Sequence, residues 1–444
     1  MNGREIALAV VRDVFPAPGS RIAERGAQEA LDYRARKAGA EPRDRAFATE
    51  LAYGAIKMRR AIDWRLEPFL GERAATLPPV IREILRLAIY EIAYTRADAH
   101  ATVFEWVNLA KRHGHRGLGN LVNAVLRSYL RDPAPEPQRE SFDGEDEYLA
   151  TRYSLPTWLV RQWHVVFGDR TEEVCAGVDL PARPAVTANA LKNDRGELAA
   201  TLNAAGIASV PSTLVEESLL IDTGAGTLRT LEHEAGGSWW MQSESSAAVA
   251  AVLDPQPGDA VLDVCSGRGS KALQLGMRLA GAGRLVCVER DPRKAAVLAR
   301  RADEAGVAVD IVTGDANDVP LPDGTFDRAL LDAPCSGIGV TGRHPEARWK
   351  KRPSDGERLS AMQRALLDRT ARCVRGGGTL AYAVCSTDPR ETTEVVEPLI
   401  ARGDFHRGTL PAAFEPFATA AGDVLIPPGI GGRDGFYIAR LVRQ

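Results

Sequence analysis

The sequence predicts a multidomain protein in three parts: an all-α N-terminal bundle (residues 1–131), a small α/β module (148–235) and an α/β, Rossmann-like domain with a doubly wound parallel sheet (236–444). Apolar residues recur at helical spacing in the first part, and strands alternate with helices in the last. The stretch 132–147, "DPAPEPQRESFDGEDE", is rich in Pro and acidic residues and breaks every period. We therefore expect a linker there.

The bundle is predicted from two apolar stripes, in "LPPVIREILRLAIYEIAY" (77–94) and "GLGNLVNAVLRSYLRD" (117–132). Arginines that fall between the apolar positions lie off these stripes, so we expect them to face solvent or phosphate. They are Arg82, Arg86, Arg127 and Arg131. The bundle carries 22 Lys and Arg against 15 Asp and Glu, a net charge of +7, while the rest of the chain carries 34 against 44. A basic module of this kind suggests a polyanionic partner.

Composition excludes several classes of protein. With 45% hydrophobic and 26% charged residues, the 444-residue chain is typical of a globular protein, and no apolar run approaches the roughly 18 residues of a membrane helix. Its N-terminus is charged and amphipathic, unlike a signal peptide, so we expect a cytoplasmic protein that does not bind membranes. The six cysteines form no CxxC pair, so we expect reduced thiols and no metal site.

The small module is predicted from "AVTANAL" (185–191), "ELAATLNAAG" (197–206) and "SLLIDTG" (218–224), which alternate strand, helix and strand. The Rossmann-like domain begins with a short buried strand, "AVLDV" (260–264), followed by a glycine-containing loop and an amphipathic helix. The amides at the start of such a helix can bind a carboxylate or a phosphate.

Polar residues follow the predicted strands of the last domain. Glu289 ends the second strand, where an acid can accept hydrogen bonds from ribose hydroxyls, and Asp315 follows the third. "RALLDAPCSGIGV" places Asp332 and Cys335 after the fourth strand, and "AVCSTDPRE" places Cys385 after the next. Because the carboxyl ends of parallel strands meet at one edge of a sheet, these side chains should converge on one crevice.

Two cofactors compete at this crevice. Residues 267–272 read Gly-Arg-Gly-Ser-Lys-Ala, which satisfies the G-x-G-x-x-A fingerprint of dinucleotide-binding proteins and points to NAD. That motif is weak by itself, and an Asp-Ala-Pro-Cys segment is unusual for a hydride-transfer site. The segment "DVLIPPGIGGRDGFYIARLVRQ" (423–444) predicts a terminal hairpin with its turn at Gly431 and Gly432.

The motifs "DVCSGRGSK", "VCVERD", "TGDA", "LDAPCSGIG", "RHPEARWKKRP" and "AVCSTDPRE" resemble, in this order, those of RNA cytosine-C5 methyltransferases. The N-terminal bundle resembles the antitermination factor NusB, which narrows the resemblance to the RsmB-type subgroup that acts on 16S ribosomal RNA. The resemblance implies S-adenosylmethionine as cofactor and a methyltransferase domain closed by the terminal hairpin. One departure lies in the loop, which usually reads Cys-Ala-Ala-Pro-Gly-Gly-Lys: Ser266, Gly267, Arg268 and Ser270 replace Ala, Ala, Pro and the second Gly.

The chemistry of this family explains why the reaction needs two cysteines. Carbon 5 of cytosine is a poor nucleophile until a thiolate adds to carbon 6, and after methyl transfer the carbon-5 proton and the thiolate must both leave. By resemblance, Cys385 attacks, Cys335 assists release and Asp332 holds the base. The cofactor residues implied are Cys265, Ser266, Gly267, Arg268, Gly269, Ser270, Lys271, Glu289, Asp315 and Asp332. We expect Cys175, Cys287 and Cys373 to be core residues.

The segment "RHPEARWKKRP" (343–353) places several cations around a tryptophan, which suits phosphate contacts and base stacking. We expect RNA contacts from Arg343, Arg348, Trp349, Lys350 and Lys351. The function we favour is methylation of carbon 5 of a cytosine in 16S rRNA, by a monomeric enzyme of ribosome biogenesis. Methylation of another RNA (tRNA or 23S rRNA), an NAD-dependent oxidoreductase and a non-catalytic RNA-binding assembly factor remain alternatives.

Overall fold

The computed structural model describes residues 1–444 and divides into two units. The helical unit comprises Met1–Asp179 and His344–Lys350, and the α/β unit comprises Leu180–Arg343 and Lys351–Gln444. None of the helices combines the length and the apolar character needed to cross a lipid bilayer.

The helical unit is built around one apolar core, to which the predicted stripe residues Ile81, Ile84 and Val125 contribute fully buried side chains. Its first helix begins with a capping box, in which Asn2 and Glu5 satisfy each other's backbone amides. The helices are α1 (Gly3–Val14), α2 (Ala27–Ala38), α3 (Pro42–Lys57), α4 (Arg59–Leu70), α5 (Arg73–Thr76), α6 (Pro79–Tyr94), α7 (Ala99–His113), α8 (Arg116–Arg131), α9 (Glu145–Arg152), α10 (Thr157–Phe167), α11 (Thr171–Asp179) and α17 (Ala347–Lys350).

The stretch 132–147 is not a free linker. The Trp64 indole donates a hydrogen bond to the Pro135 carbonyl at 3.3 Å, and its ring stacks on Phe142 with a centroid separation of 5.1 Å. Arg65 forms an ion pair with Glu136. The aromatic and acidic side chains within the Pro-rich stretch therefore fix it to α4. Helices α9–α11 also belong to the helical unit, whereas we expected a single α/β module from residue 148.

Arg86 corrects a second expectation. It was expected to face solvent, but it is 6% exposed and forms ion pairs with Asp63 at 2.7 Å and Glu83 at 2.6 Å. Acidic partners on α4 and one turn earlier on α6 make burial of its charge tolerable. Arg127 and Arg131, in contrast, are exposed as expected.

A short segment from late in the sequence, α17, completes the helical unit. Arg348 is 1% exposed, and its guanidinium donates hydrogen bonds to the carbonyls of Ser154 at 3.1 Å and Val178 at 2.7 Å. The Trp349 indole donates to the Ile56 carbonyl at 2.6 Å. These bonds satisfy carbonyls near the ends of helices α3, α9 and α11, where backbone acceptors lack intrahelical partners.

The α/β unit begins with a four-stranded antiparallel sheet in the order β2-β3-β1-β4. Its core contains Val186, Leu219 and Trp239 together with Leu198 and Leu202 from the covering helix. The structure thus contains a small module of strands and helices, as the sequence predicted. Its elements are β1 (Ala185–Ala188), α12 (Arg195–Ala204), β2 (Ala208–Pro211), β3 (Ser218–Thr223), α13 (Leu228–Glu234) and β4 (Trp239–Met241).

The second sheet has the strand order β10-β12-β9-β8-β5-β6-β7, with β11 pairing on β12. The pairs from β9 to β7 are parallel, as predicted for a doubly wound sheet. Its elements are α14 (Glu244–Leu253), β5 (Ala260–Val264), α15 (Ser270–Arg278), β6 (Arg284–Glu289), α16 (Pro292–Ala305), β7 (Asp310–Thr313), β8 (Phe326–Asp332), α18 (Pro353–Cys373), β9 (Val374–Val384), α19 (Thr393–Ala401), β10 (Phe405–Arg407), β11 (Val424–Ile426) and β12 (Phe436–Arg443).

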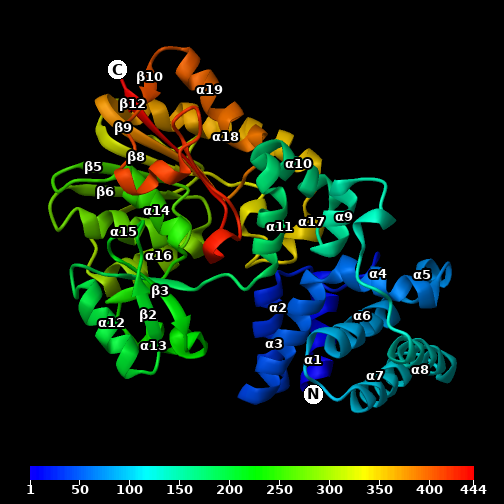
Figure 1. The fold of residues 1–444 in the computed structure, drawn as a ribbon. Coiled ribbons are helices and arrows are strands. Elements are labelled where there is room, and N and C mark those ends of the chain that lie inside the picture. Colours follow the sequence, from blue (N-terminus) through cyan, green and yellow to red (C-terminus); the bar gives the residue numbers. More distant parts are fainter. The chain divides into compact units, whose positions relative to one another are not determined.

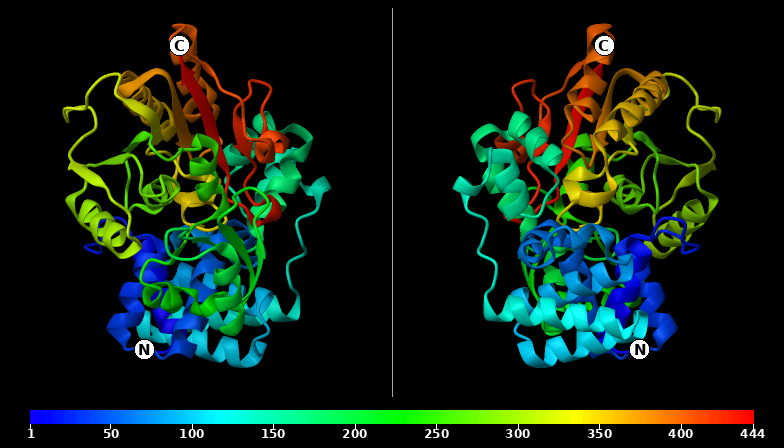
Figure 2. Two further views of the ribbon diagram at one scale, coloured as in Figure 1. Left: turned by 90° about the vertical axis from the view of Figure 1, so that its left-hand side faces the viewer. Right: turned by 90° about the vertical axis from the view of Figure 1, so that its right-hand side faces the viewer.

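Both faces of this sheet are covered. Successive residues of β5 point to opposite faces, so Val261 packs with α14–α16 and Leu262 packs with α18 and α19 (Figure 1). The chain ends in the predicted hairpin, in which β12 lies antiparallel to β9 and β11, shown in red in Figures 1 and 2. The strand order reverses between β5 and β8, and such a switch point is where open α/β sheets bind ligands.

Arg348→Ala tests the contribution of α17 to the helical unit. Removing the guanidinium leaves buried carbonyls without donors, so the free energy of unfolding should fall by about 3 kcal/mol or more. Lys351→Ala is the matched control, because the ammonium of Lys351 makes no ion pair. Thermal and urea unfolding of both variants measure the difference, and equal stability of the two would contradict the structural role of Arg348.

Candidate active site

The loop after β5 is shaped by three residues with positive φ: Cys265 (65°), Gly267 (62°) and Gly269 (91°). A Cβ at Gly269 would lie 2.3 Å from Leu298 Cδ1, so only glycine fits there. A Cβ at Gly267 would meet nothing nearer than the Cys265 carbonyl oxygen at 3.9 Å. The loop therefore packs tightly against α16 on one side and presents open backbone on the other.

Two acids from the ends of the next strands lie where the sequence predicted them. Glu289 ends β6, and its carboxylate accepts hydrogen bonds from the backbone amides of Gly267 at 2.7 Å and Asp291 at 2.8 Å. Asp315 follows β7, accepts from the amide of Asn317 at 3.0 Å and lies 3.8 Å from the Arg290 guanidinium. Glu289 is thus fixed against the loop, whereas Asp315 lies in a more open position.

Asp263, within β5, is a buried acid without a partner. It is 1% exposed, and neither carboxylate oxygen has a hydrogen-bond partner. Burial, with a further contribution from the charge of Asp332, raises the pKa of Asp263 to about 7. A cationic or hydrogen-bonding ligand at the glycine loop would give the Asp263 carboxylate the partner that it lacks. The residues present therefore fit a nucleoside cofactor with a charged tail.

Lys271 and Asp332 bridge the switch point of the sheet. Lys271 stands in the first turn of α15, and its ammonium lies 2.7 Å from the Asp332 carboxylate at the end of β8. Burial alone would lower the pKa of Lys271, but the adjacent carboxylate outweighs it and the pKa is raised. The pair links the loop after β5 to the strand that leads to Cys335.

The two thiols that the sequence singled out face each other. Strands β8 and β9 are parallel neighbours, and the amide of Ala333 donates to the carbonyl of Ala383 at 2.9 Å just before the two cysteine loops begin. The sulfurs of Cys335 and Cys385 lie 3.3 Å apart. The hydrogen bond with Cys385, together with burial, raises the pKa of Cys335 well above its usual value. Cys335 therefore keeps its proton and can donate it toward the Cys385 sulfur.

Three family models match this chain. The model described as "16S rRNA methyltransferase RsmB/F" matches residues 250–442, the "NusB family" model matches 1–131, and a "Methyltr_RsmF/B-like, ferredoxin-like domain" model matches 155–226.

Curated relatives match along almost the whole length. A "Probable ribosomal RNA small subunit methyltransferase B" from Bacillus subtilis is 34% identical over 90% of this chain and 91% of its own. The "Ribosomal RNA small subunit methyltransferase B" of Thermus thermophilus is 34% identical over 99% of this chain and 97% of its own. The chain belongs to the RsmB/F family of rRNA methyltransferases.

Solved structures agree on the fold. The structure titled "Crystal Structure of PH0851" superposes with a TM-score of 0.80 at 24% identity and covers 99% of both chains. NSun6 from Pyrococcus horikoshii, solved "with SFG", superposes with a TM-score of 0.57 at 17% identity, over 65% of this chain and 98% of its own. The expected Rossmann-like methyltransferase fold is confirmed, and membership in a methyltransferase family removes the NAD-dependent oxidoreductase as an interpretation.

One important residue of this family member was missed by the sequence analysis. Glu391 is fully buried and accepts hydrogen bonds from the Ser336 amide at 2.8 Å, the Ser336 hydroxyl, the Ser386 hydroxyl at 2.6 Å and the Gln363 amide at 3.0 Å. Because Ser336 follows Cys335 and Ser386 follows Cys385, one carboxylate holds both cysteine loops. Glu391 ends the motif "AVCSTDPRE", but nothing in its local pattern separates a buried glutamate from an exposed one.

The remaining loop residues act through the backbone. The Ser266 hydroxyl donates to the Asp263 carbonyl at 2.8 Å, and the Arg301 guanidinium donates to the Arg268 carbonyl at 3.0 Å and the Ser270 hydroxyl at 3.1 Å. The departures from the usual family loop are therefore accommodated by hydrogen bonds to β5 and α16. At Gly267, the replacement also suits a backbone conformation that an L-residue adopts only with strain.

The predicted RNA-contact residues need revision. Arg348 is buried in the helical unit, Trp349 bonds the Ile56 carbonyl, and Lys350 lies 2.9 Å from Glu24, so these three serve structure. The sequence analysis missed this because their partners are distant in sequence. The Arg343 guanidinium lies 3.3 Å from Asp434 and remains partly exposed, and Lys351 has no partner.

The other cysteines behave as expected. Cys175, Cys287 and Cys373 are fully buried, which confirms them as core residues. Cys265 is only partly covered at the start of the loop, and burial raises the pKa of its thiol to about 12, so it is protonated at neutral pH. No group of three or more His, Cys, Asp or Glu side chains is arranged to hold a metal ion.

Glu391→Gln tests the tie between the two cysteine loops. The amide that replaces a carboxylate oxygen would present N–H donors to the donors that Glu391 now accepts from, so the free energy of unfolding should fall by about 1–3 kcal/mol. The methylation rate should fall with it. Exposed Glu394, on α19, provides the matched control Glu394→Gln. Urea unfolding and single-turnover methylation measure both effects, and equal behaviour of the two variants would contradict the tie.

Asp263→Asn tests the buried acid. The pKa of Asp263 lies near 7 in the folded state and near 4 in the unfolded state, so the folded chain holds this proton more tightly. The resulting contribution to the free energy of unfolding is therefore fully present below about pH 4 and is lost as the pH rises to about 7. The full decline is about 4 kcal/mol. Asn cannot ionise, so the variant's stability relative to the parent should rise between pH 5 and pH 7 and then level off. Unfolding at several pH values without cofactor measures this, with exposed Asp318→Asn as control, and a pH-independent difference would contradict it.

Proposed function

We propose that this protein transfers a methyl group from S-adenosylmethionine to carbon 5 of a cytosine in 16S rRNA, through a covalent bond between Cys385 and carbon 6 of the base. The observation that carries the proposal is the pair of thiols 3.3 Å apart at the carboxyl ends of adjacent parallel strands. A single buried cysteine would be an ordinary core residue, whereas two facing thiols beside a charged Lys–Asp pair suit nucleophilic catalysis.

The cofactor would be held along the ends of β5, β6 and β7. Glu289 suits the ribose hydroxyls, Asp315 suits the adenine amino group, and the backbone of Gly267 offers the open approach that the tail requires. The orphaned carboxylate of Asp263 would gain a partner there. S-adenosylmethionine supplies an electrophilic methyl group when it is bound. The SFG-bound archaeal NSun6 supports this choice through its fold.

The first chemical step belongs to Cys385. Its thiolate adds to carbon 6, which forms a carbon–sulfur bond and makes carbon 5 nucleophilic as an enamine. Asp332 holds the polar edge of the cytosine and favours its protonated form, and the Lys271 ammonium, 2.7 Å away, orients the Asp332 carboxylate. Carbon 5 accepts the methyl group.

The release step belongs to Cys335. The carbon-5 proton is lost to solvent water, the electrons of the carbon–sulfur bond return to the Cys385 sulfur as that bond breaks, and the ring double bond is restored. Because Cys335 keeps its proton and lies against the Cys385 sulfur, it can donate a hydrogen bond to the departing thiolate and speed its elimination. Glu391 keeps the two loops in the register that this exchange requires.

The named relatives support 16S rRNA as substrate, and methylation of tRNA or 23S rRNA is the alternative. We place the enzyme in the cytoplasm, in ribosome biogenesis, as a monomer. Mapping of 5-methylcytosine in all three RNAs from cells with and without this protein tests the substrate. We expect a modified cytosine to be lost from 16S rRNA alone. Loss from tRNA or 23S rRNA instead would show that this other RNA is the substrate.

Replacing Cys385 and replacing Cys335 should have different effects on methylation and on the covalent protein–RNA species. Cys385→Ala should abolish methylation and any covalent protein–RNA species, because no enamine forms. Cys335→Ala should still attack and transfer the methyl group, then stall with RNA attached through Cys385. Denaturing electrophoresis after incubation with RNA and S-adenosylmethionine measures the shifted band.

The double variant is the control for this experiment and should trap no RNA. If Cys385→Ala traps RNA and Cys335→Ala does not, the roles of the two thiols are reversed. If neither variant traps RNA and both keep turnover, the thiols are core residues and the covalent route is wrong.

A further inference from the structure

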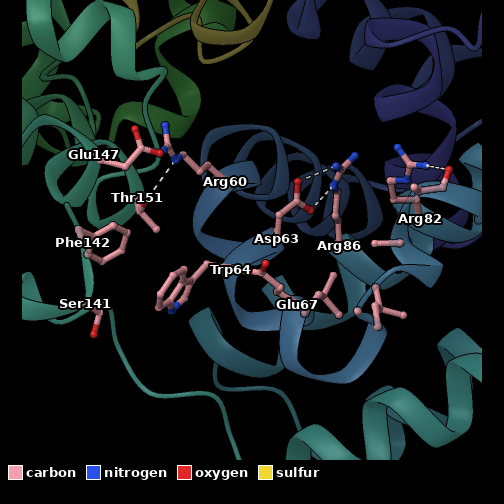
Figure 3. Close-up of a pocket in the computed structure, with 15 residues that line it drawn as sticks. Arg60, Asp63, Trp64, Glu67, Arg82, Arg86, Ser141, Phe142, Glu147 and Thr151 are labelled. Carbon is pink, nitrogen blue, oxygen red and sulfur yellow. Dashed lines mark hydrogen bonds and ion pairs between the residues drawn. The ribbon is translucent and has the colours of Figure 1, made fainter. Parts of the chain in front are cut away.

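Residues 1–131 have a net charge of +7, but many of their arginines already form ion pairs with acidic side chains. The cavity in Figure 3, of about 620 Å³, illustrates this. Arg86 at its wall forms an ion pair with Asp63 at 2.7 Å, and Arg60 forms one with Glu147. The cavity is lined by three arginines and three acidic side chains, so it has little net charge to attract a polyanion.

A second hollow lies between the helices α7 and α8, which run side by side (cyan in Figures 1 and 2). We call it the α7–α8 groove. It has a volume of about 860 Å³, and no Asp or Glu lines it. Its lining residues on α8 recur at helical spacing from Asn120 through Arg127 to Arg131, so about 17 Å of one face of the helix lines the groove.

Three cations line the groove without ion pairs. Lys111, Arg127 and Arg131 are exposed, and the only side-chain hydrogen bonds of the two arginines run to Asn123 at 3.0 Å and Ser128 at 3.3 Å. The neighbouring Arg112, outside the groove, is paired with Glu5. The groove thus places three cations that have no acidic partner along one continuous surface.

The groove also carries groups that recognise bases. Phe104 is 64% exposed, the highest exposure among the aromatic side chains reported as exposed in this structure. Asn108, Asn120 and Asn123 add side-chain amides, which can donate to and accept from the polar edges of bases. An aromatic face among cations and amides is typical of surfaces that bind single-stranded nucleic acid.

We propose that the α7–α8 groove binds a single-stranded segment of the substrate RNA, with phosphates on Lys111, Arg127 and Arg131 and a base stacked on Phe104. This inference rests on the proposed function only in taking RNA as the substrate. An acidic protein segment is disfavoured, because it would satisfy the cations but leave the exposed ring and the amides without a role.

The first experiment removes the charges. Lys111→Gln, Arg127→Gln and Arg131→Gln are combined in the full chain, and binding of a fluorescent single-stranded 16S rRNA fragment is measured at several salt concentrations. Affinity at moderate salt should fall about tenfold or more, and the slope of log affinity against log salt should become shallower by about 2, since each phosphate contact on a single strand contributes about 0.7.

The control carries the same charge change elsewhere in the helical unit. Arg36, Arg43 and Arg73 are exposed and make no ion pair, so Arg36→Gln, Arg43→Gln and Arg73→Gln are combined in a second variant. This variant should keep the parental affinity and salt slope to within about twofold. Because all six side chains are exposed, both variants should show the parental melting temperature.

The second experiment separates stacking from charge. Phe104→Ser should weaken RNA binding at least fivefold while leaving the salt slope unchanged, because a stacked base releases no counterions. Val165→Ser, on α10, is the control, since Val165 is 83% exposed and lies away from the groove.

The outcomes distinguish this inference from the proposed function. If the groove variants bind RNA normally while Cys385→Ala abolishes methylation, the groove proposal is overturned and the function stands. If the groove variants lose RNA binding but the parent protein forms no 5-methylcytosine, the groove stands and the function fails. Displacement of the RNA by polyglutamate at matched charge, with no effect of Phe104→Ser, would overturn RNA in favour of an acidic protein segment.

Discussion

The parallel pairing of β8 with β9 is the constraint on which the candidate active site depends. Each strand ends in a short loop that carries one cysteine, and the main-chain bond from Ala333 to Ala383 aligns the two loops where they begin. The sulfurs then lie 3.3 Å apart without any covalent link. Glu391, which is fully buried, accepts hydrogen bonds from both loops, so one carboxylate holds the two cysteine loops together.

Charged side chains near the two thiols are partly neutralised by one another. Lys271 and Asp332 form an ion pair across the switch point of the sheet, and the carboxylate raises the pKa of Lys271 despite its burial. Asp263 lies close to them without a partner of its own, and its pKa is raised accordingly. The crevice therefore carries more acidic side chains than its own cations neutralise, which suits a cofactor that brings positive charge.

The helical unit uses its basic residues in two ways. Arg348 and Arg86 are buried and bind carbonyls or carboxylates, so their charges contribute to folding. Lys111, Arg127 and Arg131 remain exposed along one groove. Net charge by itself does not separate these roles, because an arginine that neutralises a carboxylate and one that faces solvent count equally in the total.

The sequence by itself predicted the order of elements and which polar side chains and thiols come together at the site. Alternation of strands and helices predicted the doubly wound sheet, and the position of Cys335 and Cys385 after consecutive strands of that sheet predicted that they meet, because parallel strands end at one edge. Glu289 and Asp315 were placed by the same argument. These predictions depend on local periodicity and chain order, which a single sequence contains.

The tertiary structure alone decided which polar residues are structural. Arg348 lies in a segment that is indistinguishable by composition from a basic surface loop, yet its guanidinium binds carbonyls 194 and 170 residues earlier in the chain. The Pro-rich stretch after residue 131 looked like a linker, but Phe142 stacks on Trp64. Glu391 gave no local signal of burial. Each of these roles depends on partners that are distant in sequence, and only the folded chain brings such partners together.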